Sequence, residues 1–201
     1  GAARLGRSSG FVSNVGSDRF GEEILTTFKR EGVDTAYVAV NEGIPTNHHY
    51  VLSFDAERTI LIRHEAYPYL IPEGFVPPKW LYLSSTGEHA ETFHLELTTW
   101  LKEHPETKLA FQPGTFQIKM GKEELKELYA MTEIFACNKE EAELILGLDE
   151  TGMKELLEKM RALGPKIVLI TDGPNGAYAS DGNETLKVPM YPDARPPLER
   201  T

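Results

Sequence analysis

The sequence predicts an α/β fold with a mostly parallel central sheet, for two reasons. From residue 80 onward, short apolar stretches with strand character alternate with longer stretches of helical periodicity. Regular alternation of this kind sets the strands in parallel and packs helices on both faces of the sheet. The chain is also long enough for a buried core, since 201 residues with 40% hydrophobic side chains suit one sizeable domain.

The sequence of the N-terminal part of the chain predicts four elements. They are the last turns of a helix at 1–6, a strand at 11–15, a helix at 20–30 and a strand at 36–40. Gly6 closes the first helix and Gly32 stops the second, in which Ile24, Leu25 and Phe28 share one face. Because a chain rarely begins inside an element, we expect the natural N-terminus to lie upstream of Gly1.

Residues 48–54 and 59–63 predict a β-hairpin, joined by residues 55–58. Tyr50, Leu52 and Phe54 point to one side of the first strand, and the residues between them point to the other. This alternation suits a sheet with one covered face. The hairpin does not fit the strand–helix alternation, so we expect a small appended sheet, a lid, at about 41–65.

The remaining elements follow the alternation. We expect strands at 80–84, 108–111, 134–137 and 167–171, helices at 89–103, 122–129, 140–146 and 153–163, and a strand pair, 177–180 with 185–188, around a turn at 181–183. Open α/β sheets bind ligands at the carboxyl ends of their strands. The loops after Phe111, Cys137 and Thr171 are therefore the candidate site.

Composition excludes several partner classes. The formal charge is −10, from 31 acidic and 21 basic residues, and no cluster of Lys or Arg offers a surface to nucleic acid or to an anionic membrane. No apolar run approaches the roughly 20 residues that span a bilayer. The single cysteine, Cys137, excludes a disulfide within the chain, which fits a cytoplasmic location, and its apolar neighbours favour a buried structural thiol.

The loop after the strand at 167–171 reads TDGPNGA over residues 171–177. Glycine at 173 and 176 lets a ligand approach the backbone closely, and Thr171 offers a hydroxyl at the strand end. The alternative is an ordinary tight turn, for which this composition is typical. The loop is not a Walker motif, because no Gly-Lys-Ser/Thr follows it.

Asn138 and Glu141 have the spacing of a capping box at the start of the helix after Cys137. Capping alone would explain both residues. The functional alternative is that the Glu141 carboxylate organises Mg²⁺ through water near a triphosphate, since both residues face the open end of the sheet. The two interpretations are compatible.

The loop after Phe111 contains Pro113-Gly114, a turn signal, and its polar side chains are either exposed or close to substrate.

The six histidines predict no metal site. His89 and His94 are five residues apart, which misses helical i, i+4 geometry, and His48 and His49 point to opposite faces of a strand.

Several segments share a recognisable order and spacing. They are residues 2–6, 15–21 and 31–35 taken together, then NKEEAE at 138–143, TDGPNGA at 171–177 and ERT at 199–201. In this order they resemble the ribokinase (PfkB) family of carbohydrate and nucleoside kinases, with its Asn-x-x-Glu motif, its Thr-x-Gly-x-x-Gly nucleotide loop and the approach to its Gly-Ala-Gly-Asp signature. The resemblance covers the whole chain and implies a single ribokinase-like three-layer sandwich plus a small β lid.

The resemblance implies transfer of the ATP γ-phosphoryl group to a hydroxyl of a sugar or nucleoside. The signature Asp would be the base, and the signature glycines would form an anion hole at a helix N-terminus. Asn138 and Glu141 would help to place Mg²⁺ and the phosphates, with Glu141 as the residue nearest the metal. The nucleotide site would be lined by Thr171, Gly173 and Gly176, and Thr201 would lie at the edge of the anion hole.

The resemblance also implies which residues lie near the substrate, and the sequence departs from the family pattern in places. Thr46, Asn47 and His49 would lie near the sugar, and the hairpin lid would offer a homodimer contact. QPGT at 112–115 departs from the family's Asp-Pro-Asn pattern, which leaves the sugar open. The first strand and the Gly-Ala-Gly-Asp signature are absent from the sequence, so we expect the 201 residues alone to be inactive. The alternatives are a non-catalytic nucleotide- or sugar-binding module and a dimerising structural fragment.

Overall fold

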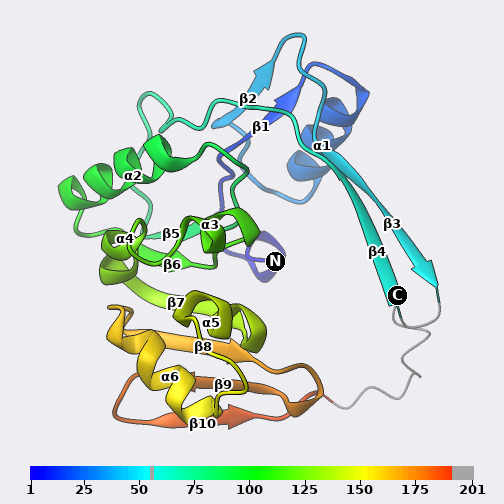
Figure 1. The fold of residues 1–201 in the computed structure, drawn as a ribbon. Helices are drawn as coiled ribbons and strands as arrows, with labels where there is room; N and C mark the ends of the chain where they lie inside the picture. The colour runs from blue at the N-terminus through cyan, green and yellow to red at the C-terminus, as the bar shows by residue number, and fades with distance from the viewer. Residues whose placement is uncertain (55–56, 192–201) are drawn as a thin grey trace. The chain divides into compact units, whose positions relative to one another are not determined.

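The computed structural model describes residues 1–54 and 57–191 (Figure 1). By its internal contacts the chain falls into two compact units, one formed by residues 1–75 and one that begins at residue 76. The expectation of a single domain across the chain stays a prediction.

The first unit contains a β–α–β segment. Its elements are β1 (Ser13–Gly16), α1 (Arg19–Arg30) and β2 (Val38–Asn41), and the two strands pair in parallel. Before them, residues 3–5 form one 3₁₀ turn, which Gly6 closes with a φ of 74°. The structure thus confirms the glycine stop but has a short turn where the sequence predicted the end of a longer helix. The first strand begins later than predicted, and Phe11 and Val12 before it are exposed.

The hairpin forms as the sequence predicts, from β3 (His48–Phe54) and β4 (Glu57–Arg63), and it is a two-stranded sheet of its own. Tyr50 pairs with Leu61 on one face, and Val51 pairs with Ile60 on the other. All four side chains are exposed, by 62%, 52%, 50% and 44%. Both faces carry exposed apolar side chains in the single chain, so the expectation of one covered face stays a prediction.

The second unit is built on a six-stranded sheet with the order β10-β9-β8-β7-β6-β5. Its strands are β5 (Trp80–Leu83), β6 (Lys108–Phe111), β7 (Thr132–Asn138), β8 (Ile167–Thr171), β9 (Ala177–Ser180) and β10 (Thr185–Val188). The first four run parallel to one another, and β9 and β10 are antiparallel additions at one edge. The mostly parallel sheet is confirmed.

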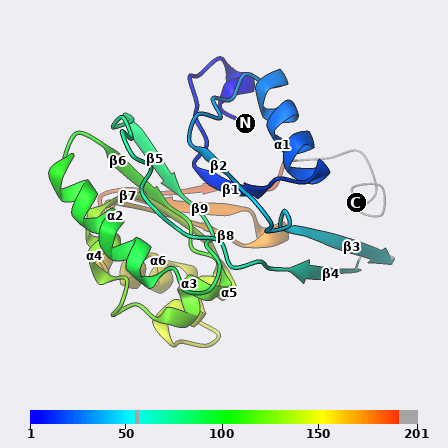
Figure 2. The same ribbon diagram turned by 90° about the horizontal axis from the view of Figure 1, so that it is seen from above.

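Helices pack on this sheet between successive strands. They are α2 (Glu91–Glu103), α3 (Thr115–Met120), α4 (Lys126–Met131), α5 (Lys139–Leu146) and α6 (Met153–Ala162). All five lie on the same face of the sheet (Figure 2). Strands β5 to β8 are added one after another in a single direction, and right-handed crossovers then place every helix on one side. Within this unit the expected second helical face is not formed by the described residues.

The segment after β6 differs from its prediction. Pro113-Gly114 does not mark an open turn but precedes α3, with Gly114 in the N-cap position. The Gln117 side chain is fully buried, although the sequence predicted an exposed or substrate-facing loop. The next helix begins at Lys126, after a non-helical stretch at 122–125, so the predicted start at 122 is too early.

The core of the second unit lies between this sheet and its helices. Three fully buried rings, those of Phe111, Tyr129 and Phe135, are in mutual contact, with centroid separations of 5.7, 5.7 and 5.4 Å. Cys137 is buried on the same strand as Phe135, and this burial raises the pKa of its thiol to about 12. The thiol is therefore structural at neutral pH, as predicted. Among the described helices, none has the length and apolar character of a transmembrane span.

Candidate functional site

The carboxyl ends of β7 and β8 bring two predicted site residues together. Asn138 is the last residue of β7 and Thr171 the last of β8, and the two are register partners across the parallel pair. The neighbouring strand β6 ends at Phe111 on the same edge, since all three strands run parallel. The three loops that sequence reasoning selected therefore share one edge of the sheet.

Asn138 and Glu141 form the predicted capping box at the start of α5. The backbone N–H of Glu141 donates to Asn138 Oδ1 at 2.8 Å, and the backbone N–H of Asn138 donates to Glu141 Oε2 at 2.8 Å. Two of the otherwise unpaired N–H groups of the helix start are thereby satisfied. Both residues are only partly buried, so capping leaves the carboxylate accessible from solvent.

The loop after Thr171 is a compact turn. Its residues Gly173–Asn175 form a 3₁₀ helix, and the N–H of Asp172 donates to the Gly176 carbonyl at 2.8 Å. The N–H of Asn175 in turn donates to the Asp172 carbonyl at 2.8 Å. The tight-turn interpretation is thus correct at the level of the backbone, and it leaves open which of the two glycines serves a ligand.

The two glycines of this loop differ in the atoms that surround them. A Cβ at Gly176 would lie 2.2 Å from the carbonyl oxygen of Val188, so this glycine is required by packing against the end of β10. A Cβ at Gly173 would meet nothing within 4 Å, and this residue is exposed with a φ of 47°. Only Gly173 leaves open backbone beside Thr171, where a ligand could approach.

The described residues contain no cluster of three or more His, Cys, Asp or Glu side chains that could hold a metal ion. Mg²⁺ usually keeps several water ligands and is held by substrate phosphates with one or two carboxylates. Glu141 can supply such a carboxylate, since its cap bond uses Oε2 and leaves a second oxygen.

Gln117 is a site-edge residue that sequence reasoning missed. Its buried side chain lies between the loops after β5 and β6 and makes hydrogen bonds to both. The sequence held one signal for it: a Gln three positions after Gly114 is the N3 residue of a helix start. Reading Pro113-Gly114 as a turn concealed this signal.

In the first unit, the predicted substrate residue Thr46 is buried and fully engaged. Its hydroxyl donates to Asp18 Oδ1 at 2.6 Å and accepts from the N–H of Gly16 at 2.9 Å. Asp18 also accepts from the N–H groups of Thr46 and Gly21, at 2.8 and 2.9 Å. These bonds, led by the one from the Thr46 hydroxyl, lower the pKa of Asp18 to about 2.

The other two predicted substrate residues follow directly on Thr46. Asn47 Oδ1 accepts from the N–H of Glu65 at 2.6 Å, which ties the start of β3 to the segment after β4. His49 is exposed on β3. The structure describes these residues within the first unit and Asn138, Glu141, Thr171 and Gly173 within the second. Thr201 lies outside the described residues.

A shallow pocket of about 330 Å³ lies elsewhere on the second unit, between α2 and residues 120–128. None of the predicted site residues lines it. The pocket therefore does not coincide with the carboxyl edge, and the geometry of the strand ends remains the basis of the candidate site.

The capped helix α5 and the glycine loop after β8 meet at the carboxyl edge of this α/β sheet, where sheets of this class bind ligands. Comparison with known proteins is more specific. The model of the pfkB family carbohydrate kinases matches residues 1–195, so the chain belongs to this family. The resemblance seen in the sequence is confirmed.

Individual relatives are distant. The chain is 23% identical to the ribokinase of Staphylococcus aureus over 94% of its own length and 63% of that protein. It is 27% identical to the fructokinase of Klebsiella pneumoniae over 96% of its length and 66% of that protein. The chain thus spans about two thirds of the curated relatives it matches.

Solved structures show the fold. The structure of Arabidopsis thaliana ribokinase complexed with ribose and ATP superposes with a TM-score of 0.77 at 21% identity, covering 96% of this chain and 65% of that one. At this level of identity the likeness concerns the fold alone. The ribokinase-like α/β fold predicted from the sequence is confirmed.

Proposed function

We propose that the protein containing this chain transfers the γ-phosphoryl group of ATP to a hydroxyl of a sugar or sugar-like substrate. Membership of the carbohydrate kinase family supports the reaction class. The observation that carries the proposal is the pairing of Asn138 with Thr171 at the carboxyl ends of β7 and β8, which sets the capped helix beside the glycine loop.

The nucleotide side of the site is proposed to lie along this edge. Gly173 offers exposed backbone at the end of β8, and the Thr171 hydroxyl beside it is exposed and can donate to a phosphate or ribose oxygen. Gly176 contributes indirectly, by allowing the loop to close against the end of β10. Thr201 is proposed for the edge of an anion hole from the family resemblance alone.

Mg²⁺ fits the edge through Glu141. When bound, the metal would neutralise charge on the transferring phosphates, as in other phosphoryl transfers. Glu141 would hold it directly or through water, and Asn138 would keep the carboxylate in place from the opposite side of the capping box. The positive end of the α5 dipole adds to the attraction for phosphate at this point.

The sugar is proposed to be held by residues around the start of the hairpin, namely Thr46, Asn47 and His49. Thr46 would act through its fixed position, because its hydroxyl and its backbone N–H are already bonded to Asp18 and Gly16. His49 is exposed and available to a hydroxyl-rich ligand. Relatives named for different sugars match the chain at similar identity, so the proposal extends to the substrate class and not to one sugar.

The base is proposed to be the Asp of the family signature, which the 201 residues do not contain. We therefore propose that the 201 residues alone transfer no phosphate. The full gene product should be assayed for ADP release with Mg·ATP against a panel of sugars and nucleosides, with the isolated 201-residue chain alongside. Sugar-dependent ADP release by the full product supports the proposal. Its absence across the panel contradicts it, and turnover by the isolated chain contradicts the assignment of the base.

The exposed hairpin supports a homodimer as a second element of the proposal. Leu52 and Phe54 are 57% and 81% exposed on one face, where burial against a second copy would remove apolar surface from water. Replacing Leu52 by Lys should convert a dimer to a monomer in sedimentation equilibrium. Ser53→Lys, on the opposite face of the same strand, is the matched control. A protein that is monomeric before any substitution contradicts this part of the proposal.

The cytoplasmic location stays a prediction.

A further inference from the structure

The side chain of Gln117 joins the loops that follow β5 and β6. Its Oε1 accepts from the N–H of Gly114 at 2.8 Å and from the N–H of Thr86 at 3.3 Å. Its Nε2 donates to the carbonyl of Ser84 at 3.3 Å. One buried amide therefore bonds to both loops, which places it directly behind the carboxyl edge of the sheet.

The orientation of this amide is forced by its partners. Two backbone N–H groups face one end, so that end is the oxygen, and a backbone carbonyl faces the other, so that end is the nitrogen. The loops also touch directly, since a Cβ at Gly114 would lie 1.9 Å from Ser85 Oγ. Glycine at 114 is therefore needed for the two loops to approach each other this closely.

His94 on α2 completes the arrangement. Its Nε2 lies 3.2 Å from Gln117 Nε2, and because that nitrogen is a donor, His94 Nε2 must be the acceptor. The imidazole is therefore neutral, with its proton on Nδ1. That Nδ1 is buried without a hydrogen-bond partner, which costs stability that an apolar residue in the same place would not lose.

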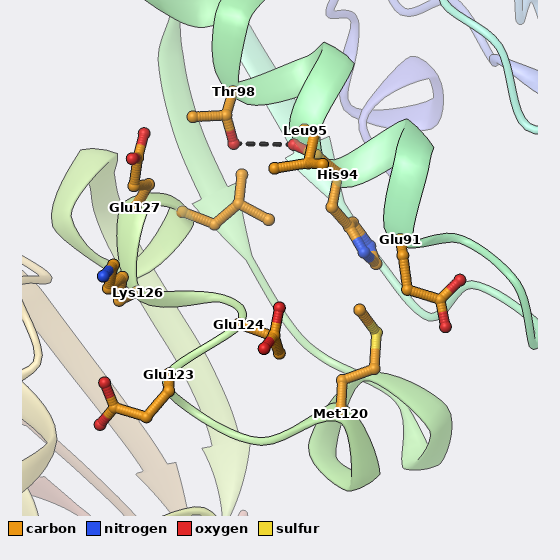
Figure 3. A pocket seen from close by; sticks show the side chains of 10 residues that line it. Glu91, His94, Leu95, Thr98, Met120, Glu123, Glu124, Lys126 and Glu127 are labelled. Carbon is orange, nitrogen blue, oxygen red and sulfur yellow. Dashed lines mark hydrogen bonds between the residues drawn. The ribbon is translucent and has the colours of Figure 1, made fainter.

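The charged groups around His94 come from two elements. Figure 3 shows its imidazole pointing from α2 toward Met120, into the pocket between α2 and residues 120–128. The charged residues that line this pocket are Glu91 on α2 itself and Glu123, Glu124, Lys126 and Glu127 from the facing segment. Glu127 is paired with Lys102 at 2.5 Å. Burial outweighs the attraction of Glu91 and lowers the pKa of His94 to about 4.

We propose that Gln117 is a positioning residue for phosphoryl transfer: it fixes the loops at 84–86 and 112–114 beside the proposed active site, and neutral His94 fixes Gln117. This inference rests on the proposed function, because it takes the carboxyl edge as the site. Gln117 does not touch the reacting atoms. It acts by holding two backbone segments in the geometry that the reaction needs.

Four variants of the full-length protein separate this role from packing. Gln117→Met keeps the buried volume and removes every hydrogen bond of the amide. Gln117→Glu keeps the acceptor for Gly114 and Thr86 but removes the donor toward Ser84 and His94. His94→Gln retains an acceptor within reach of Gln117. Thr98→Val, the control, removes a buried bond of 2.7 Å to the His94 carbonyl on the same helix and leaves Gln117 untouched.

The expected result is a loss of activity in Gln117→Met that exceeds what its loss of stability explains, because the N–H groups of Gly114 and Thr86 lose their acceptor as well. Gln117→Met should lower kcat/KM about tenfold or more, the effect of small misplacement at a reacting centre, and should speed amide exchange at Gly114 and Thr86. Thr98→Val should also lower the unfolding midpoint, because it removes a buried hydrogen bond, but it should keep kcat/KM within about twofold. The kcat/KM of His94→Gln should lie between that of Gln117→Met and that of the wild type.

The imidazole titration gives a readout that packing alone would not move. In Gln117→Glu the donor to His94 Nε2 is lost and a carboxylate replaces it, so the His94 titration midpoint should rise by NMR. If this variant leaves the midpoint unchanged, the pairing of Gln117 with His94 is wrong. If Gln117→Met does not fold, Gln117→Glu and His94→Gln still test the pairing and its kinetic consequence.

The experiment separates failure of the positioning role from failure of the proposed function. If the wild-type protein phosphorylates a sugar and Gln117→Met does so with unchanged kcat/KM, the loops are held but the reaction does not need them, and the positioning role is overturned. If the wild type phosphorylates nothing, the proposed function fails and the positioning role with it, while amide exchange still shows whether Gln117 fixes the two loops.

Discussion

The carboxylate of Glu141 and the side chain of Asn138 each accept the backbone N–H of the other residue, both at 2.8 Å. The box explains why Asn and Glu stand at the start of α5 without any ligand. It also means that removing Glu141 would disturb the helix and any Mg²⁺ site together. A useful substitution must therefore keep one role and remove the other.

Glu141→Gln makes this separation. The Gln carbonyl can still accept from the N–H of Asn138, so the free energy of unfolding should change by less than about 0.5 kcal/mol. The lost charge should raise the KM for Mg·ATP about tenfold or more if Glu141 places the metal, as measured in the full-length enzyme at several Mg²⁺ concentrations.

Glu141→Ala is the matched comparison. It removes both the cap and the charge, so it should cost about 1 kcal/mol of stability in addition to the same rise in KM. An unchanged KM in Glu141→Gln, with the stability loss confined to Glu141→Ala, would show that the residue only caps the helix.

Gly176 and Gly173 should respond differently to alanine. Gly176→Ala forces a Cβ to 2.2 Å from the Val188 carbonyl, so it should cost about 3 kcal/mol or more in urea unfolding, since the opposing atoms are backbone. Gly173→Ala meets no neighbour, and its φ of 47° should cost about 1 kcal/mol. The KM for ATP should rise chiefly in Gly173→Ala, and equal effects on unfolding would contradict the distinction.

The strands of the second unit and their succession along the chain could be predicted because their signals are local. Strands β6, β8, β9 and β10 have the predicted bounds, since each is a short apolar or alternating run between turn residues. The face on which the helices lie could not be predicted in the same way. It depends on the direction in which strands are added, and strand order is a long-range property.

The candidate site was predictable to a similar extent. Asn138 and Thr171 could be placed together because both end strands of a parallel sheet. The roles of Thr46 and Gln117 could not be inferred, since both depend on contacts with residues distant in sequence, Asp18 for Thr46 and Ser84 for Gln117. The sequence alone does not distinguish a polar residue that the fold buries from one that is exposed to solvent.

Thr46 should be needed for the stability of the first unit. Thr46→Val keeps the shape and leaves the N–H of Gly16 and the carboxylate of Asp18 without the hydroxyl, so it should cost about 3 kcal/mol in urea unfolding. Thr46→Ser retains the hydroxyl and should cost about 1 kcal/mol or less. If Thr46→Val is as stable as Thr46→Ser, the two bonds contribute little.

Asp18 should make the folded protein sensitive to acid below about pH 4. Its pKa is about 2 in the folded state against an ordinary 3.8, chiefly because the Thr46 hydroxyl donates to its ionised form. A depressed carboxylate pKa stabilises the fold above the unfolded-state value, and this contribution is lost as pH falls from about 4 toward 2. Urea midpoints measured from pH 6 to pH 2 should therefore fall more steeply in the wild type than in Asp18→Asn.

Asp34→Asn is the control for this pH dependence, because the exposed Asp34 carboxylate accepts one local N–H, from Ala36 at 2.9 Å, where Asp18 accepts from Gly21 and from two groups of Thr46. Its pH profile should follow the wild type. The curves of the wild type and Asp18→Asn should approach each other as pH falls toward 2, because protonation progressively removes the advantage of the native carboxylate. Parallel curves across the whole range would show that the bonds to Asp18 stabilise both protonation states equally, contrary to the prediction.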